Sequence, residues 1–97
     1  MRKIDLVNYA IEGGMYDVKG SLQTLLYSPE LGLGYKELFD NHRVAKKIKL
    51  AEDSVLLEEA DYQILKRVTE AFKGYSRNEV ELIQRVLEAP EVSIKEA

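Results

Sequence analysis

The sequence predicts an α+β fold that is predominantly helical, with about four helices, a small two- or three-stranded β element and a C-terminal helical hairpin. Four segments repeat apolar residues with the 3.6-residue period of a helix that buries one face. Three shorter segments are apolar runs or alternate between apolar and polar residues, as strands do. The chain has 97 residues and no linker-like stretch, so we expect residues 1–97 to form a single domain.

The turn between the last two predicted helices carries the strongest local signal. Gly74 suits the left-handed C′ position that follows a helix. Ser76 and Glu79 have the spacing of a capping box, in which each side chain bonds a backbone N–H at the other residue. Tyr75 and Val80 occupy the two positions of a hydrophobic staple. We therefore expect one helix to end and another to begin here, forming a helical hairpin.

The predicted helices span residues 17–27, 35–48, 59–73 and 77–88. Proline sets two of these limits, because the residue before a proline avoids the helical region; Pro29 ends the first helix and Pro90 the last. Lys73 is expected in the last turn of the third helix, where a cation interacts favourably with the helix dipole. The last helix is expected to turn four polar side chains away from its apolar stripe: Glu81, Gln84, Arg85 and Glu88.

The predicted strands are residues 4–7, 54–57 and 92–95. The first two are short apolar runs beside turn-forming residues, and the third alternates strictly. The N-terminal run through Ile11 fits a helix equally well. A patch of two or three strands packed on the helices would accommodate these segments, since an isolated hairpin is only marginally stable in water.

No pattern predicts catalysis, a metal site or a cofactor site. The chain has no cysteine, and its one histidine, His42, cannot supply the usual four ligands of zinc; we expect it to be partly buried and hydrogen-bonded. Gly32 and Gly34 precede a helix but lack the other residues of a phosphate-binding loop, so a turn is expected there. We therefore expect a protein that is not an enzyme and binds no cofactor.

Charge and hydropathy favour a cytoplasmic protein without membrane contact. The net charge is −3, so the molecule as a whole does not attract nucleic acid or anionic lipid. No apolar run approaches the roughly 20 residues that span a membrane, and the N-terminus lacks the apolar stretch of a signal peptide. Charge is uneven, however. Residues 31–50 have five basic and two acidic side chains, whereas residues 51–97 have six basic and eleven acidic ones.

The helix over residues 35–48 has an apolar side and a basic side. Its apolar side groups Leu38, Val44, Ala45 and Ile48. Four cations lie on the other side, within an arc of roughly 100°: Lys36, Arg43, Lys46 and Lys47. Lys49 would fall on the apolar side, so the helix is expected to end before it. The four cations, or the helix-turn-helix-like corner, offer an alternative function as a small nucleic-acid-binding regulator, although Glu79 and Glu81 would repel phosphates at that corner.

The leading functional hypothesis is a non-catalytic protein–protein interaction or assembly protein that self-associates. Six tyrosines accompany only two phenylalanines and no tryptophan, and tyrosine is enriched at protein interfaces. The helix over 77–88 is apolar over about half its circumference, more than one flat partner would cover. We therefore expect a partner interface at Tyr62, Leu82, Val86 and Leu87, with a protein partner or a second copy of the chain.

Two runs in the C-terminal half have a characteristic layout. Ser54-Val-Leu-Leu-Glu-Glu-Ala-Asp-Tyr-Gln-Ile-Leu-Lys leads from a short strand into a helix, and Arg85-Val-Leu-Glu-Ala-Pro-Glu-Val closes the helical hairpin that follows. In this layout, residues 54–92 resemble small accessory proteins encoded in bacteriophage and prophage gene clusters. The resemblance includes no signature motif and implies no particular functional residue. It implies an assembly or adaptor role in a bacterial cytoplasm.

Overall fold

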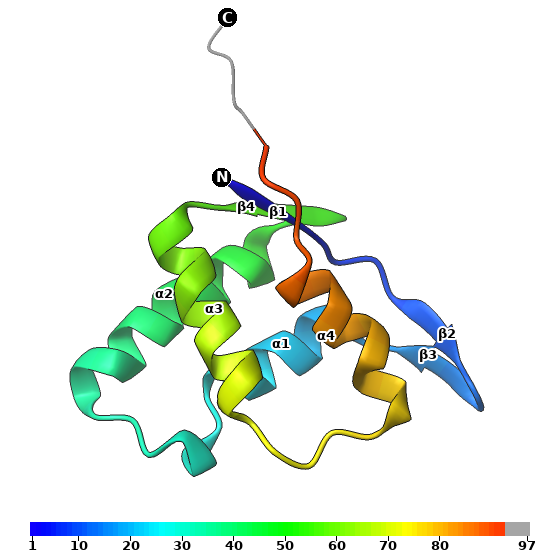
Figure 1. The fold of residues 1–97 in the computed structure, drawn as a ribbon, viewed down its shortest axis with the longest axis horizontal. Coiled ribbons are helices and arrows are strands. Elements are labelled where there is room, and N and C mark those ends of the chain that lie inside the picture. The colour runs from blue at the N-terminus through cyan, green and yellow to red at the C-terminus, as the bar shows by residue number, and fades with distance from the viewer. Residues whose placement is uncertain (93–97) are drawn as a thin grey trace, which may run out of the picture.

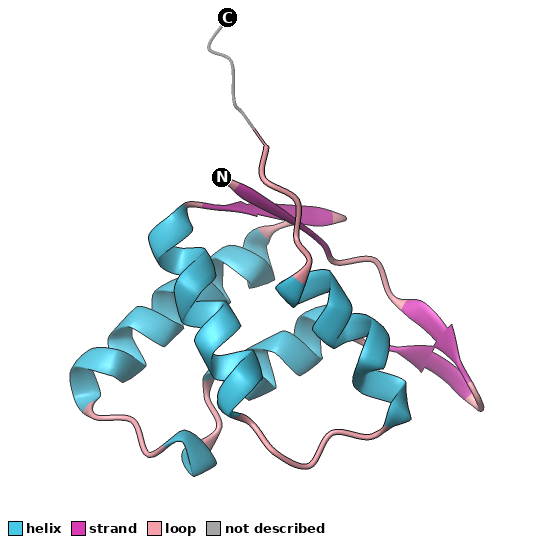
Figure 2. Ribbon diagram, in the orientation of Figure 1, coloured by secondary structure: helices cyan, strands magenta, loops and turns pink. Residues whose placement is uncertain are grey.

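The computed structural model describes residues 1–92 and confirms a predominantly helical α+β fold (Figures 1 and 2). The α-helices are α1 (Val18–Leu26), α2 (Tyr35–Leu50), α3 (Glu59–Ala71) and α4 (Val80–Leu87). Two short 3₁₀ helices precede α2 and α4, namely η1 (Pro29–Leu31) and η2 (Arg77–Glu79). The strands are β1 (Arg2–Asp5), β2 (Tyr9–Ile11), β3 (Gly14–Tyr16) and β4 (Ser54–Leu57).

The strands form two separate two-stranded antiparallel sheets (Figure 2). One pairs β1 with β4, so that Ile4 lies opposite Val55, and the other is the hairpin of β2 and β3. The predicted strand over 54–57 is confirmed at both ends. The predicted strand over 4–7 lies two residues earlier, and the helical alternative for the N-terminal run is wrong, because this segment pairs as strands.

The third predicted strand, over 92–95, lies outside the described residues except for Val92. The chain just before it does approach the N-terminus. Arg2 forms an isolated antiparallel bridge with Glu91, and the Val92 backbone N–H donates to the Met1 carbonyl at 2.7 Å. The described end of the chain therefore runs beside β1, although no strand is assigned to it.

The hydrophobic core lies where the four helices meet beneath the β1–β4 sheet (Figure 1). The largest side chains that are fully buried come from every helix and from both strands of that sheet: Tyr62, Ile4, Leu22, Leu26, Ile48, Leu57, Leu65, Leu82, Val18, Val44 and Val86. Helices α1 and α2 pack on each other, and α3 contacts α1, α2 and α4. Helix α3 therefore lies at the centre of the molecule, and α4 covers it from one side.

Helix α2 extends beyond its predicted end. It continues to Leu50, because Lys49 lies in the helix with its side chain exposed and does not enter the core. Leu38, predicted on the apolar side, is 40% exposed. The core position nearby is taken by Asn41, whose side-chain amide donates to the Leu26 carbonyl at 2.8 Å and so satisfies a terminal carbonyl of α1.

The corner between α3 and α4 keeps its predicted capping box. The Ser76 backbone N–H donates to Glu79 Oε1 at 3.1 Å, and the Ser76 hydroxyl accepts from a backbone N–H of η2. The predicted C′ position of Gly74 is wrong. Helix α3 ends at Ala71 and Phe72 is its C-cap, so Gly74, with φ of +108°, stands two residues past the cap. Lys73 consequently lies outside the helix and not in its last turn.

The hydrophobic staple predicted at this corner does not form as expected. Val80 is 50% exposed, while Tyr75 packs on Phe72 with ring centroids 5.0 Å apart. The Tyr75 hydroxyl donates to the Thr69 carbonyl at 2.9 Å, which holds the ring against the end of α3. Arg77–Glu79 form the 3₁₀ turn η2, which has 3.0 residues per turn and not 3.6, so Val80 is rotated about the helix axis relative to its place in an α-helix that starts at Arg77.

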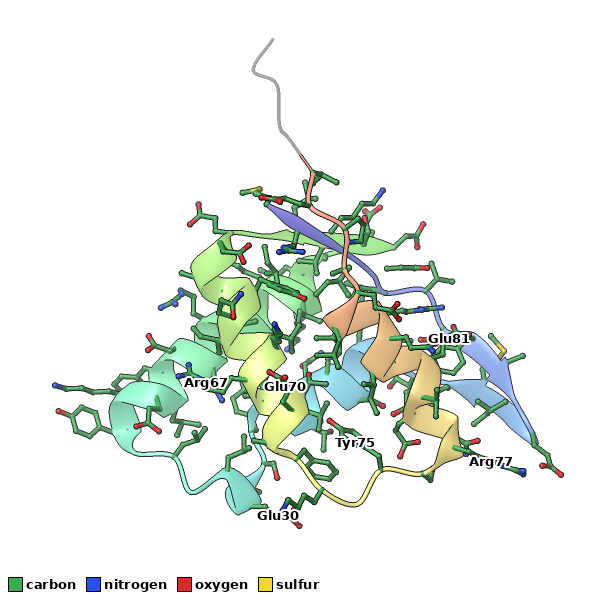
Figure 3. All side chains as sticks on the ribbon, in the orientation of Figure 1. Glu30, Arg67, Glu70, Tyr75, Arg77 and Glu81 are labelled. Carbon is green, nitrogen blue, oxygen red and sulfur yellow. The ribbon has the colours of Figure 1, made fainter. Side chains whose placement is uncertain are left out.

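Two arginines, one in α4 and one in η2, attach the β2–β3 hairpin to this part of the protein. Arg85, predicted to face away, is only 17% exposed; it donates to the Val7 carbonyl at 2.5 Å and lies over the Tyr9 ring at 5.0 Å from its centroid. Arg77 extends toward the hairpin turn, where it pairs with Glu12 at 2.5 Å (Figure 3). A long arginine stem can pack on apolar surface while its guanidinium binds carbonyls, so charge alone does not predict the exposure of Arg85.

Candidate interaction surface

The interface residues predicted on α3 and α4 belong mainly to the core. Tyr62, Leu82 and Val86 are each no more than 2% exposed, so they cannot form a contact surface in this fold. This part of the prediction is wrong. Leu87, at 37% exposed, is the one member of the predicted set that reaches the surface.

The contact between Tyr62 and α4 explains this burial. The Tyr62 hydroxyl donates to the Val86 carbonyl at 2.7 Å and lies 3.3 Å from the Leu87 carbonyl. The last carbonyls of a helix lack the i+4 partners of its interior, and the phenol adds a short bond at Val86, whose carbonyl otherwise accepts only from the Ala89 backbone N–H at 3.4 Å and the N–H of the C-cap. Burial raises the pKa of Tyr62, which keeps the hydroxyl protonated as a donor. The centre of the apolar stripe of α4, at Leu82 and Val86, is therefore buried against the rest of the protein.

The predicted basic face of α2 is divided by an ion pair to α3. Lys36, Arg43, Lys46 and Lys47 are all exposed residues, as predicted. However, Arg43 donates to Asp61 Oδ1 from Nη2 at 2.9 Å and from Nε at 3.2 Å, and Lys47 Nζ donates to Asp61 Oδ2. Arg43 also pairs with Asp40 at 3.0 Å. Two of the four predicted cations are thus engaged within the protein.

Asp61 is a buried carboxylate that the sequence suggests only as a favourable charge at a helix start. It is 4% exposed and accepts from both cations of α2. Burial alone would raise its pKa, but the hydrogen bonds from Lys47 and Arg43 outweigh burial and hold the pKa of Asp61 below its usual value. The carboxylate therefore stays charged at neutral pH and joins α2 to α3.

The side of α2 opposite the core presents large apolar side chains to solvent. Tyr35 is 68% exposed, Phe39 66% and Leu50 72%. They fall on one side because spacings of 4 and 11 residues both return close to the same angle of a 3.6-residue helix. Lys36 and Lys46 flank them, and within residues 1–92 neither lysine has a carboxylate within ion-pair distance. We call these five residues the α2 outer face.

The aromatic pair on the α2 outer face has a defined geometry. The rings of Tyr35 and Phe39 lie edge to face, with centroids 6.1 Å apart and an angle of 75° between their planes. Such pairs are favourable beyond the area they bury. The pair therefore presents one preformed apolar ridge near the start of α2, while Leu50 stands at its other end.

A shallow groove lies beside the α2 outer face. It has a volume of about 400 Å³ and is bordered by Tyr27 of the α1 C-cap and by His42 and Lys46 of α2. His42 is exposed, which corrects the expectation of partial burial, but it is hydrogen-bonded as predicted, with Nδ1 2.6 Å from the Tyr27 hydroxyl. The exposed surface of α2 thus continues toward the end of α1.

The described residues offer no group of three or more His, Cys, Asp or Glu side chains placed to hold a metal ion. Within the same range, no helix combines the length and apolar character that crossing a membrane requires. We found no family model, curated protein or solved structure that matches this chain.

Proposed function

We propose that this protein is a non-catalytic interaction protein that self-associates through the α2 outer face. The observation that carries the proposal is the row of three large apolar side chains, each about two-thirds exposed, on the side of a 16-residue helix opposite the core. A helix in a monomer normally turns polar residues to solvent, and large apolar side chains exposed along one side of a helix are typical of an interaction site.

A second copy of the chain, packed antiparallel along α2, fits the charges of this helix. Residues 35–42 of α2 contain one basic and two acidic side chains, whereas residues 43–50 contain four basic ones. Parallel packing would bring the two strongly basic halves together. Antiparallel packing brings each basic half beside the more acidic half of the other copy, and it also opposes the two helix dipoles favourably.

The spacing of the α2 outer face is compatible with a two-fold antiparallel contact. With the axis between positions 42 and 43, Tyr35 of one copy meets Leu50 of the other. Phe39 then meets Lys46, whose aliphatic stem and ammonium can both contact an aromatic ring. Every apolar member of the face thus finds a partner, which is what an isologous interface requires.

The molar mass in solution tests this proposal. Light scattering or sedimentation at concentrations up to about 100 μM should give twice the 11.1 kDa of the chain, and Phe39→Lys should return the mass to that of the monomer. Met15→Lys is the matched control, because Met15 is 63% exposed on β3, away from α2. A monomeric wild type, or equal dissociation by both variants, would contradict the proposal.

The orientation can be tested separately because the chain contains no cysteine. Single variants Phe39→Cys and Lys46→Cys, mixed and oxidised, should form the 39–46 disulfide in preference to 46–46. Parallel packing would instead give symmetric disulfides, since identical positions would face each other. Each disulfide requires the two Cα atoms to come within about 7 Å, so the product identifies the register.

Binding of single-stranded nucleic acid is a second candidate for the same face. Exposed aromatic rings next to lysines can stack on bases and contact phosphates, and Tyr35, Phe39, Lys36 and Lys46 provide such a set. The engagement of Arg43 and Lys47 by Asp61 weakens this alternative by removing two of its four cations. Fluorescence anisotropy with a labelled oligonucleotide at about 50 mM salt, where phosphate contacts are strongest, would detect it.

The resemblance of residues 54–92 to phage-encoded accessory proteins supports the same class of function. Such a protein would contribute to an assembly or adapt one protein to another, and a self-associating helix face is suited to either task. The solution mass of the wild type and of Phe39→Lys tests the self-association on which such a role would depend.

A further inference from the structure

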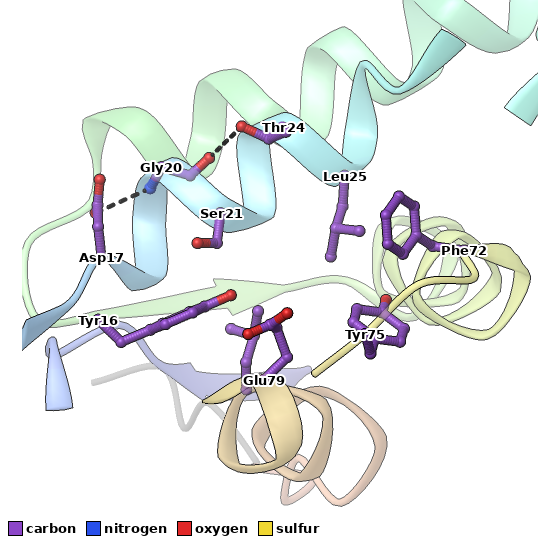
Figure 4. A pocket seen from close by; sticks show the side chains of 10 residues that line it. Tyr16, Asp17, Gly20, Ser21, Thr24, Leu25, Phe72, Tyr75 and Glu79 are labelled. Carbon is purple, nitrogen blue, oxygen red and sulfur yellow. Dashed lines mark hydrogen bonds between the residues drawn. The ribbon is translucent and has the colours of Figure 1, made fainter. Parts of the chain in front are cut away.

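A second concave region lies on the other side of the molecule from the α2 outer face, between α1 and the corner that joins α3 to α4 (Figure 4). Its volume is about 400 Å³, within the range of small-ligand sites. Figure 4 shows α1 along one side, Tyr16 at one end, Phe72 and Tyr75 at the other, and Glu79 between them. We call this region the aromatic cleft.

The aromatic rings of this cleft are held in place by contacts with other rings and with the backbone. Tyr16 stacks on Tyr9, with ring centroids 5.0 Å apart and only 16° between the planes. Phe72 and Tyr75 contact each other with centroids 5.0 Å apart. The hydroxyl of Tyr75 is already donated to the Thr69 carbonyl, so this residue offers the cleft its ring. Three partly buried rings from two distant parts of the chain therefore converge on one space.

The charges around the aromatic cleft have a single sign. Asp17 and Glu79 line it, and among the described residues that line it none is basic. These charges also act on the phenols that line the cleft. Burial raises the pKa of Tyr16, and the nearby Glu79 and Asp17 carboxylates raise it further. Burial likewise raises the pKa of Tyr75 to about 12, with a contribution from Glu79. Both phenols stay neutral at physiological pH.

Anions are disfavoured at the helix ends that border the cleft. Asp17 Oδ1 accepts from the Gly20 backbone N–H at 3.1 Å, and Glu79 Oε1 accepts from the Ser76 backbone N–H at 3.1 Å. The amides that would bind a phosphate or carboxylate are thus already occupied by the protein's own carboxylates. A positively charged ligand, in contrast, meets aromatic rings and two carboxylates, with no basic side chain among the described residues that line the cleft.

We propose that the aromatic cleft binds an organic cation, an alkylated ammonium or a guanidinium group. Aromatic faces attract such cations through the ring quadrupole, and carboxylates at the rim add Coulombic attraction. The volume suits one cationic head group, whether it belongs to a free small molecule or to a lysine or arginine side chain of a protein partner. This site is independent of the α2 outer face and goes beyond self-association.

Titration with choline and with its uncharged isostere 3,3-dimethylbutan-1-ol tests the proposal, because the two probes have nearly the same shape. In amide ¹H–¹⁵N NMR spectra, choline should shift residues around Tyr16, Phe72 and Tyr75 with a dissociation constant of about 1–10 mM. The isostere should bind at least about fivefold more weakly. Equal affinities, or no shifts at these residues up to about 50 mM choline, would overturn the proposal.

A double variant removes the cleft's charge while retaining both helix caps. Asp17→Asn with Glu79→Gln keeps an N-cap acceptor and a capping-box side chain, since asparagine and glutamine serve these roles. Choline affinity should fall severalfold toward that of the isostere, whose own binding should not change, and the preference that remains is the part due to the aromatic rings. Glu52→Gln with Asp53→Asn makes the same change in net charge at exposed positions away from the cleft and should leave choline binding intact. Unchanged choline affinity in the first variant would refute the assignment.

A second ligand separates the two sources of the cation. N-acetyl-arginine amide represents an arginine side chain within a protein, whereas choline represents a free ammonium compound. Tighter binding of the arginine derivative would assign the cleft to a protein partner, and tighter binding of choline to a small molecule; either supports the proposal. Failure of both cations to exceed the neutral isostere would overturn it. None of these outcomes depends on whether the protein dimerises.

Discussion

Replacing Asp61 by alanine should destabilise the protein by about 2 kcal/mol at neutral pH. The carboxylate is 4% exposed and accepts three charge-assisted hydrogen bonds, two from Arg43 and one from Lys47. Buried hydrogen bonds to charged groups contribute about 1.5–3 kcal/mol each. Here both donors keep close to half of their side-chain exposure and can return to water, so solvent screening reduces the total to about one such bond.

The loss of stability caused by Asp61→Ala should depend on pH, and the shift in the pKa of Asp61 determines the direction of that dependence. That pKa is lower in the folded protein than in the unfolded chain, because the bonds from Lys47 and Arg43 outweigh the effect of burial. The unfolded chain therefore binds the proton first as pH falls. The stability due to Asp61 is complete above about pH 5, and it is lost as pH falls below about 4 through the folded-state pKa.

Urea unfolding followed by circular dichroism, at pH 7 and at pH 2.5, measures both effects. With a slope of about 1.5 kcal/mol per molar urea, the midpoint of Asp61→Ala should lie roughly 1.3 M below that of the wild type at pH 7. Asp40→Ala is the matched control, since Asp40 is a half-exposed partner of Arg43 and should cost less than about 0.5 kcal/mol. Equal losses for the two variants, or the same loss from Asp61→Ala at both pH values, would refute the reasoning.

Two further predictions concern buried phenols. Tyr62→Phe should cost about 1–2 kcal/mol, because it removes the buried hydrogen bond from the phenol to the Val86 carbonyl; thermal unfolding would report a fall of roughly 5–15 °C, and an unchanged midpoint would contradict the role given to this hydroxyl. The pKa of Tyr75 is raised to about 12, so its ionisation favours the unfolded chain. Stability should therefore fall as pH rises from about 10 to 12, and Tyr75→Phe should reduce that fall in urea titrations; an identical pH dependence in the variant would exclude Tyr75 as its source.

The elements that the sequence predicts well are those specified by local signals. The capping box of Ser76 and Glu79 is fixed by contacts three residues apart, and it forms as expected. The four helices are predicted because each buries one side, and this gives an apolar period that is visible without knowing which element covers that side. The strand over 54–57 is bounded by turn residues and by Glu59, where the next helix begins. In each case the information lies within a few residues of the element.

Most errors concern which of two faces is buried, and this depends on distant parts of the chain. The sequence pattern of the apolar stripe of α4 is the same whether the stripe packs on α3 or on a partner. Only the contact with Tyr62 of α3 shows that it packs within the protein. Arg85 turns inward because Val7 and Tyr9, almost 80 residues earlier, supply a carbonyl and a ring. Asn41 is buried because an unpaired carbonyl of α1 lies opposite it. No local pattern reveals these partners.

The α2 outer face shows the opposite kind of error. Its apolar spacing is present in the sequence, but a search for the buried side of the helix does not detect it. Tyr35, Phe39 and Leu50 share a helical angle as regular as that of any core stripe. The periodicity of α2 therefore indicates two apolar sides, and a helix with two apolar sides needs two partners. The core provides one, through Val44 and Ile48, which are fully buried.

The ion pair at Asp61 makes the second partner easier to accommodate. An antiparallel contact centred between positions 42 and 43 brings Arg43 of one copy close to Arg43 of the other, and two uncompensated guanidinium groups would repel across the axis. Each Arg43 is instead bonded to Asp61 of α3 and to Asp40 of its own helix. The carboxylate that joins α2 to α3 thus also removes the strongest like-charge conflict from the proposed interface, while Lys46 stays free to lie over Phe39. Packing within one copy and the proposed association between copies consequently favour the same arrangement of charges on α2.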